Sequence, residues 1–140
     1  MFLATLANIV IVSLCVMVHY EMLARISSVL PTLKIIPRIK ILVGVLGALI
    51  AHIMEIWIFA LGYYLLIKTG KFGDLVGSAG NGLIDYAYYS FVTYTSLGFG
   101  DVLPTDHLRF LTGLETLTGL VLIAWTASFM FLEMQKYWRH

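Results

Sequence analysis

The sequence has little charge, and this scarcity excludes most soluble protein classes. Of its 140 residues, only 12% are Asp, Glu, Lys or Arg, whereas 60% are hydrophobic. An ordinary soluble domain has roughly 25% charged residues, about twice the share found here. The mean hydropathy of the chain is +0.91. The formal net charge of +1 gives no electrostatic argument for a nucleic-acid partner. The composition therefore predicts a protein that crosses a membrane several times.

Cysteine and catalytic motifs are equally scarce. Cys15 is the single cysteine, so an internal disulfide is excluded, and its place in an apolar run predicts a small buried side chain. The sequence shows no set of nucleophile, base and orienting residue, and no nucleotide-binding loop. We therefore do not expect an enzyme.

Basic residues are missing from the start of the chain, where a secretory signal peptide would need them. No Lys or Arg precedes Arg25, and the apolar run from Phe2 to His19 is long enough to span a membrane. We expect residues 1–20 to form a spanning helix that is kept in the mature protein. No span carries Arg or Lys at every third position, so a voltage sensor is not expected.

The remaining spans are separated by prolines and glycines. Pro31 and Pro37 interrupt any continuous helix over 21–38, which predicts an amphipathic connector on the cytoplasmic membrane surface. The glycine-rich residues 68–81 predict an aqueous linker. The other expected elements are an outer helix at 39–67, a short helix at 82–94, a loop at 95–101, an inner helix at 107–134 and a tail at 136–140. The predicted fold class is an all-α membrane protein with three spans.

Lys and Arg are distributed unequally on the two sides of these spans. One side has six of them and the other has three. The six are Arg25, Lys34, Arg38, Lys40, Lys136 and Arg139, and the three are Lys68, Lys71 and Arg109. Because Lys and Arg are enriched in cytoplasmic loops, the connector and the C-terminus are expected in the cytoplasm, with the N-terminus outside.

Closely spaced glycines interrupt the chain between the second and third apolar runs. The sequence over 93–101 is Thr-Tyr-Thr-Ser-Leu-Gly-Phe-Gly-Asp. Gly98 and Gly100 free the backbone for φ values that residues with a Cβ avoid. Alternating such glycines with ordinary residues can turn successive carbonyls to one side, and a column of carbonyl oxygens can replace the water shell of a cation. This stretch is therefore a candidate ion-binding loop.

The loop resembles the selectivity filter of the tetrameric potassium channel family, whose pattern is T-x-G-Y/F-G-D. Here the pattern is S-L-G-F-G-D: Ser96 keeps the hydroxyl of the usual threonine, whereas Phe99 lacks the hydroxyl of the commoner tyrosine. The resemblance covers about residues 40–135 and implies that Ser96, Leu97, Gly98 and Phe99 coordinate K⁺. It also implies that Thr95, Gly100, Asp101, Tyr88 and Tyr89 support the filter.

Oligomeric state and location are also implied by this resemblance. One chain supplies one filter segment and has no internal repeat, so a closed ring needs several copies, and the family implies four in cyclic symmetry. The expected partners are copies of the chain, membrane lipid and permeant K⁺, with no other cofactor. The expected location is the bacterial inner membrane.

The short helix at 82–94 is expected to enter the membrane without crossing it. Asn81 is a candidate N-cap, and Asp85 suits the positive end of the helix dipole. Four such helices would aim their negative ends at a central cavity and favour a cation there.

Ionisable residues lie well inside the second and last predicted spans, where charge is costly and usually faces protein or water. His52 and Glu55 share a face of the second span, and Glu115 lies in the last. They predict a polar cluster that ties helices together, with a proton-sensitive gate or a metal or haem site as alternatives. Together with Gly119, a hinge or close-packing residue, they are the gating candidates. A proton-sensitive gate would change open probability between pH 5 and 8.

The sequence thus predicts a potassium-selective homotetrameric channel. A weakly selective cation channel is the nearest alternative, and ion-replacement reversal potentials would distinguish it. A membrane metal- or haem-binding protein that uses His52, Glu55 and Glu115 is the alternative from a different class.

Overall fold

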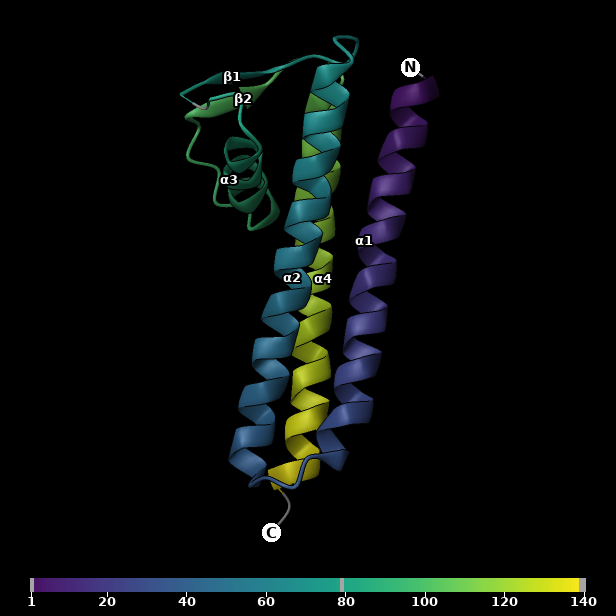
Figure 1. The fold of residues 1–140 in the computed structure, drawn as a ribbon, viewed down its shortest axis with the longest axis vertical. Helices are drawn as coiled ribbons and strands as arrows, with labels where there is room; N and C mark the ends of the chain where they lie inside the picture. Colours follow the sequence, from purple (N-terminus) through teal and green to yellow (C-terminus); the bar gives the residue numbers. More distant parts are fainter. Residues whose placement is uncertain (1, 79, 139–140) are drawn as a thin grey trace.

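Three apolar runs of the sequence form three long helices that lie side by side (Figure 1). The computed structural model describes residues 2–78 and 80–138. The long helices are α1, Phe2–Val29; α2, Pro37–Lys68; and α4, Leu108–Trp138. Their 28, 32 and 31 residues exceed the roughly 20 that cross a hydrocarbon core. The predicted all-α membrane fold with three candidate spans is confirmed.

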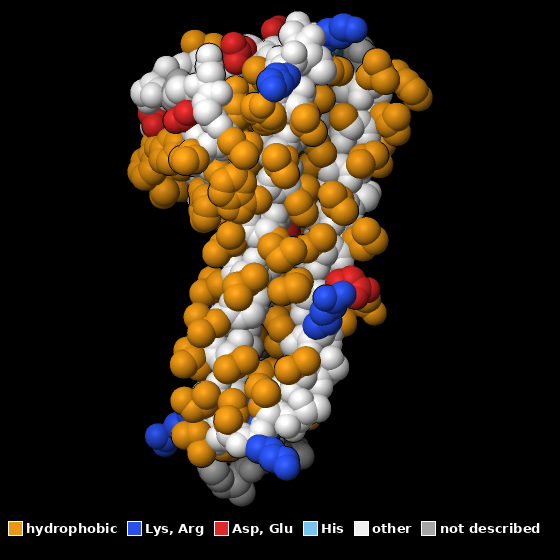
Figure 2. Space-filling view, in the orientation of Figure 1, with side chains coloured by type: hydrophobic (Ala, Val, Ile, Leu, Met, Phe, Trp, Pro, Cys, Tyr) orange, Lys and Arg blue, Asp and Glu red, His pale blue; other side chains and the backbone are white. Residues whose placement is uncertain are grey.

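The outer surface of the bundle is apolar, as lipid requires. Hydrophobic side chains cover almost the whole length of the face in Figure 2, and most of its Lys and Arg side chains lie toward the two ends. Large hydrophobic residues are exposed along all three helices, including Leu6, Leu46 and Leu120. These faces suit contact with acyl chains or with other subunits.

The first helix is longer than predicted. Helix α1 continues to Val29 because no proline occurs before Pro31, so residues 21–29 extend the span instead of forming a separate surface helix. A short 3-10 helix, η1 (Leu30–Thr32), follows, and Pro37 occupies the first turn of α2 after the extended Ile36. The predicted amphipathic connector is thereby reduced to the short connection at residues 30–36.

The C-terminal boundary also differs from the prediction. Helix α4 extends beyond residue 134, so Lys136 lies in its last turn and not in a separate tail. Arg139 and His140, the end of the predicted tail, lie outside the described residues.

The segment between α2 and α4 contains helix α3, Leu83–Tyr94, and a two-stranded antiparallel sheet. Gly82, and not Asn81, is the N-cap of α3, and its N–H donates to the Asp85 carboxylate at 3.0 Å. Helix α3 lies beside α2 in the half of the bundle that carries the sheet, which we call the sheet end (Figure 1).

The sheet was not predicted from the sequence. Strand β1, Leu75–Gly77, pairs with β2, Val102–Pro104, so that Gly77 lies opposite Val102. Ser78 N–H donates to the Asp101 carbonyl at 3.0 Å. The glycine-rich linker therefore folds back onto the residues that follow the candidate filter.

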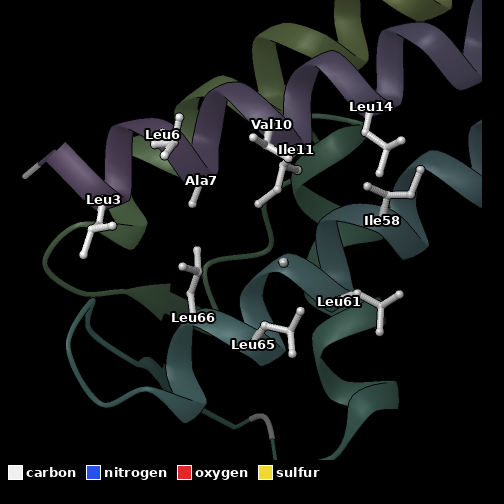
Figure 3. A pocket seen from close by; sticks show the side chains of 11 residues that line it. Leu3, Leu6, Ala7, Val10, Ile11, Leu14, Ile58, Leu61, Leu65 and Leu66 are labelled. Carbon is white, nitrogen blue, oxygen red and sulfur yellow. The ribbon is translucent and has the colours of Figure 1, made fainter.

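An apolar groove of about 520 Å³ separates α1 from α2 near the sheet end. Figure 3 shows leucines of α1 facing Ile58, Leu61 and Leu65 of α2 across it. At Gly62 the Ile11 side chain of α1 packs against the backbone of α2, because a Cβ there would lie 2.7 Å from Ile11 Cδ1. Small residues allow such approaches between membrane helices.

We predict that Gly77→Ala destabilises the protein more than Gly70→Ala. Both glycines have positive φ, 140° and 66°, but a Cβ at Gly77 would lie 2.0 Å from the Asp101 carbonyl oxygen, whereas Gly70 has no neighbour within 4 Å. Backbone strain alone costs about 1–2 kcal/mol, and the clash adds about 1–3 kcal/mol. Thermal unfolding of detergent-purified protein measures both variants. Equal losses would contradict this role for Gly77.

Candidate functional site

The candidate filter has an alternating backbone. Ser96, Gly98 and Gly100 have φ of 56°, 53° and 76°, whereas Leu97 and Phe99, which separate them, do not have positive φ. Every second residue therefore lies in the left-handed region. Such alternation turns successive peptide groups so that their like ends converge on one side. The positive φ values of Gly98 and Gly100 are those that the glycine spacing predicts.

The loop is tied to the end of α3 by its own amides. Leu97 N–H and Gly98 N–H both donate to the Val92 carbonyl, at 2.9 and 3.2 Å, and Ser96 N–H donates to the Thr93 carbonyl at 2.9 Å. The Ser96 hydroxyl donates to the carbonyl of Thr95 at 2.7 Å. Its oxygen keeps lone pairs that could face a cation.

Of the two predicted aromatic supports, Tyr88 hydrogen-bonds to the candidate filter segment. The Tyr88 hydroxyl donates to Asp101 Oδ2 at 2.8 Å, so two of the predicted supporting residues bind each other. This hydrogen bond raises the pKa of Tyr88, since ionisation would remove the donated proton beside a carboxylate. Tyr89 lines the cavity beside Ser96 and Gly98, and its hydroxyl lies 2.9 Å from Thr112 Oγ1 of α4.

The C-terminal end of α3 packs closely against α4 at Gly119. A Cβ on Gly119 would lie 2.1 Å from the Tyr94 carbonyl oxygen and 3.1 Å from the Tyr94 ring. The Thr116 hydroxyl adds a hydrogen bond to the Thr93 carbonyl at 3.3 Å. Gly119 is therefore a close-packing residue, and it holds the residues immediately before the filter.

Glu55 is the centre of a polar cluster that joins α1, α2 and α3. Its carboxylate is fully buried and lies 2.8 Å from His19 Nδ1 and 3.1 Å from His52 Nδ1. The Tyr94 hydroxyl donates to Glu55 Oε2, and its oxygen lies 2.9 Å from His52 Nδ1. Cys15, also buried, places its sulfur 3.8 Å from the Glu55 carbonyl oxygen.

Helix α4 completes this cluster through Thr126. The Thr126 hydroxyl oxygen lies 3.0 Å from His52 Nε2 and 3.4 Å from His19 Nε2. Four helices thus contribute side chains to one group, which we call the Glu55 cluster: His19, His52, Glu55, Tyr94 and Thr126.

Glu115 has different partners from those predicted. Its carboxylate binds Tyr63, whose hydroxyl donates to Oε2 at 2.7 Å, and Ser90, whose hydroxyl donates to Oε1. The Ser90 hydroxyl also faces the Ile56 carbonyl at 2.9 Å. The structure brings His52 and Glu55 together, as their spacing suggested, but it places Glu115 of α4 in a second network with Tyr63 of α2 and Ser90 of α3.

Sequence reasoning missed His19 and Tyr94. His19 lies 36 positions before its partner Glu55, so no local pattern connects them. The available signal was its position at the end of an apolar run, because an ionisable group in a span usually faces protein. Tyr94 adjoins the filter motif and could be taken for an interfacial aromatic.

A comparison with protein families matches residues 41–136 to a family described as Ion channel. The chain belongs to this ion channel family. The match covers α3, the loop and most of α2 and α4, and it leaves α1 outside. Comparisons with curated proteins and with solved structures returned no match. This channel is an integral membrane protein whose family-defining part begins at the second long helix.

We predict that Gly119→Ala impairs this channel, whereas Gly113→Ala does not. Both glycines lie in α4, but Gly113 has no neighbour within 4 Å of an added Cβ, whereas Gly119 has the Tyr94 carbonyl. The Gly119 variant must displace the end of α3, at a cost of about 1–3 kcal/mol. Gly113→Ala should gain up to about 1 kcal/mol from helix propensity.

Thermal unfolding and ion flux in liposomes measure the two variants together. Loss of flux in Gly119→Ala, with flux retained in Gly113→Ala, is the expected result. Wild-type flux and stability in Gly119→Ala would show that this contact is dispensable.

Proposed function

We propose that this chain forms a potassium-selective channel, with residues 95–101 as its filter. The alternating left-handed residues Ser96, Gly98 and Gly100 carry the proposal. They allow the carbonyls of Ser96, Leu97, Gly98 and Phe99 to line one side of the loop. Carbonyl dipoles in several layers replace the hydration shell of K⁺ and allow rapid passage between adjacent sites. The Ser96 hydroxyl would close the inner end.

The chain is proposed to act as a homotetramer in cyclic symmetry. Leu97 is 60% exposed and Phe99 is 66% exposed in the single chain, although both lie in a loop that should be shielded at membrane depth. Non-helical backbone is tolerated there only where protein or a water-filled cavity surrounds it. Neighbouring copies would bury these side chains and close the ring of carbonyls.

The orientation of the chain in the membrane is proposed from the distribution of its Lys and Arg residues. Lys34, Arg38 and Lys40 lie at or after the turn between α1 and α2, which would face the cytoplasm. The sheet end, with the filter, would face outward, and the membrane would be the bacterial inner membrane. The C-terminal end of the α3 dipole would then point toward the inner cavity and favour a cation.

The gating candidates are proposed to act through the position of α3. Tyr94 is held between the Glu55 carboxylate on α2 and Gly119 on α4, one residue before the filter begins. Glu115 holds Ser90, one turn earlier in the same helix. A movement of α2 against α4 would therefore reach the filter through these two contacts.

We predict that the conducting species is a tetramer, because each chain offers a single filter segment. Mass photometry or native mass spectrometry in detergent, followed by flux of the same fraction after reconstitution, measures this. Four chains in the active fraction is the expected result. A monomer or dimer that conducts K⁺ would overturn the proposed pore.

We predict that Gly98→Ala removes K⁺ selectivity or conduction. No atom lies within 4 Å of an added Cβ in the single chain, so the cost comes from the backbone at φ 53°, about 1–2 kcal/mol per subunit. A thousandfold preference for K⁺ over Na⁺ is worth only about 4 kcal/mol. Gly70→Ala, at φ 66° outside the filter, is the matched control and should conduct normally.

Other filter substitutions should have graded effects on reversal potentials in mixed K⁺ and Na⁺. Ser96→Ala should weaken the innermost site, and Phe99→Tyr should be mild. Ser96→Thr keeps the hydroxyl, but the φ of 56° at Ser96 disfavours a β-branched side chain, so its effect should be larger than that of Phe99→Tyr. Unchanged selectivity in Gly98→Ala would show that this loop is not the filter. Low selectivity for K⁺ over Na⁺ in the unaltered protein would instead favour a weakly selective cation channel.

A further inference from the structure

We propose that His19, His52 and Glu55 form a binding site for one divalent transition-metal ion per chain, of which Zn²⁺ is the representative. One ligand atom from each residue lies within 4.8 Å of the others. Two imidazole nitrogens and a carboxylate oxygen are a ligand set that Zn²⁺ uses with an open fourth position. Nitrogen ligands favour such ions over K⁺, Ca²⁺ and Mg²⁺, which prefer oxygen.

The ligand spacing is close to what the ion requires. Ligands about 2.1 Å from a tetrahedral Zn²⁺ lie about 3.4 Å apart. The Glu55 carboxylate oxygens are 2.8 Å from His19 Nδ1 and 3.1 Å from His52 Nδ1. Small side-chain rotations would open this space, and the Tyr94 hydroxyl, 2.9 Å from His52 Nδ1, lies beside the remaining position.

Both imidazole rings present the same edges to the same neighbours. Each Nδ1 faces Glu55, and each Nε2 faces the Thr126 hydroxyl, at 3.4 Å for His19 and 3.0 Å for His52. Without metal, an Nδ1 proton on each ring can be donated to the carboxylate. With metal at Nδ1, each ring proton moves to Nε2, and the two lone pairs of Thr126 Oγ1 can accept both. Thr126 thus has the position of the outer acceptor that metal-binding histidines usually have.

The charge of the cluster also favours a cation. Glu55 is fully buried within a membrane-spanning helix, where an uncompensated carboxylate is costly. Among residues 2–78 and 80–138, its ion-pair partners are the two histidines, and no Lys or Arg lies within ion-pair distance. A divalent ion would add positive charge beside this carboxylate, and His52, whose side chain is 13% exposed, gives access to the site.

The test is metal binding to the purified full-length chain in detergent, so it does not depend on conduction or on its ion selectivity. After treatment with a chelator, Zn²⁺ is titrated calorimetrically, and Co²⁺ is added separately to record the visible absorption of a tetrahedral nitrogen–oxygen site. We expect one ion per chain and a Co²⁺ spectrum typical of four-coordination. Stoichiometry well below one, or a six-coordinate Co²⁺ spectrum, would overturn the proposal.

Variants separate this site from adventitious binding. His19→Gln and His52→Gln should each weaken Zn²⁺ binding at least about tenfold, whereas His107→Gln, at an exposed histidine outside the cluster, should not. Thr126→Val leaves all three ligands in place and should weaken binding about 10- to 100-fold, and Thr126→Ser should restore it. Unchanged affinity in both ligand variants, or equal loss in His107→Gln, would overturn the proposal. Circular dichroism checks that each variant is folded.

Discussion

A buried carboxylate is the constraint on which the arrangement of the four helices depends. Glu55 lies in the middle of a span, where it must have partners or pay a large desolvation cost. Its oxygens meet His19 of α1, His52 of α2 and Tyr94 of α3, and Thr126 of α4 closes the group through the histidines. Moving any one helix away would leave polar atoms unsatisfied in lipid, so this cluster fixes the helices more specifically than apolar contacts can.

The same constraint explains how a short helix and an irregular loop can lie beside three spans. Helix α3 has only 12 residues, and the loop after it has no regular structure that would satisfy its backbone. The chain meets this requirement locally: the carbonyls of Val92 and Thr93 accept the first loop amides, and β1 covers the residues after the filter. Neighbouring helices then hold α3 from two sides. Glu55 of α2 accepts from Tyr94, while on α4 Glu115 accepts from Ser90 and Gly119 packs against Tyr94.

Local features of the sequence predicted local structure well. The spans, the short helix and the backbone alternation at Gly98 and Gly100 all follow from runs, breakers and glycine spacing within a few residues. Contacts between helices were predicted poorly, because a helix that is apolar on every side has no polar face to show which side packs inward. His19 was therefore overlooked, and Glu115 was grouped with the wrong partners. The β1–β2 pairing was missed because three-residue strands give no measurable period.

These contacts give a structural reason for α1, which the family match does not include. The match begins at residue 41, yet His19 supplies one of the two histidines that compensate Glu55. Without α1, the carboxylate would lose that partner, and the face of α2 that carries Gly62 would lose the packing of Ile11. Since Tyr94 depends on Glu55 and lies next to the filter, an element outside the pore region contributes to the position of the residues that are proposed to select the ion. If residues 95–101 are the filter, as proposed, the extra helix is part of the support of that filter and not only a membrane anchor.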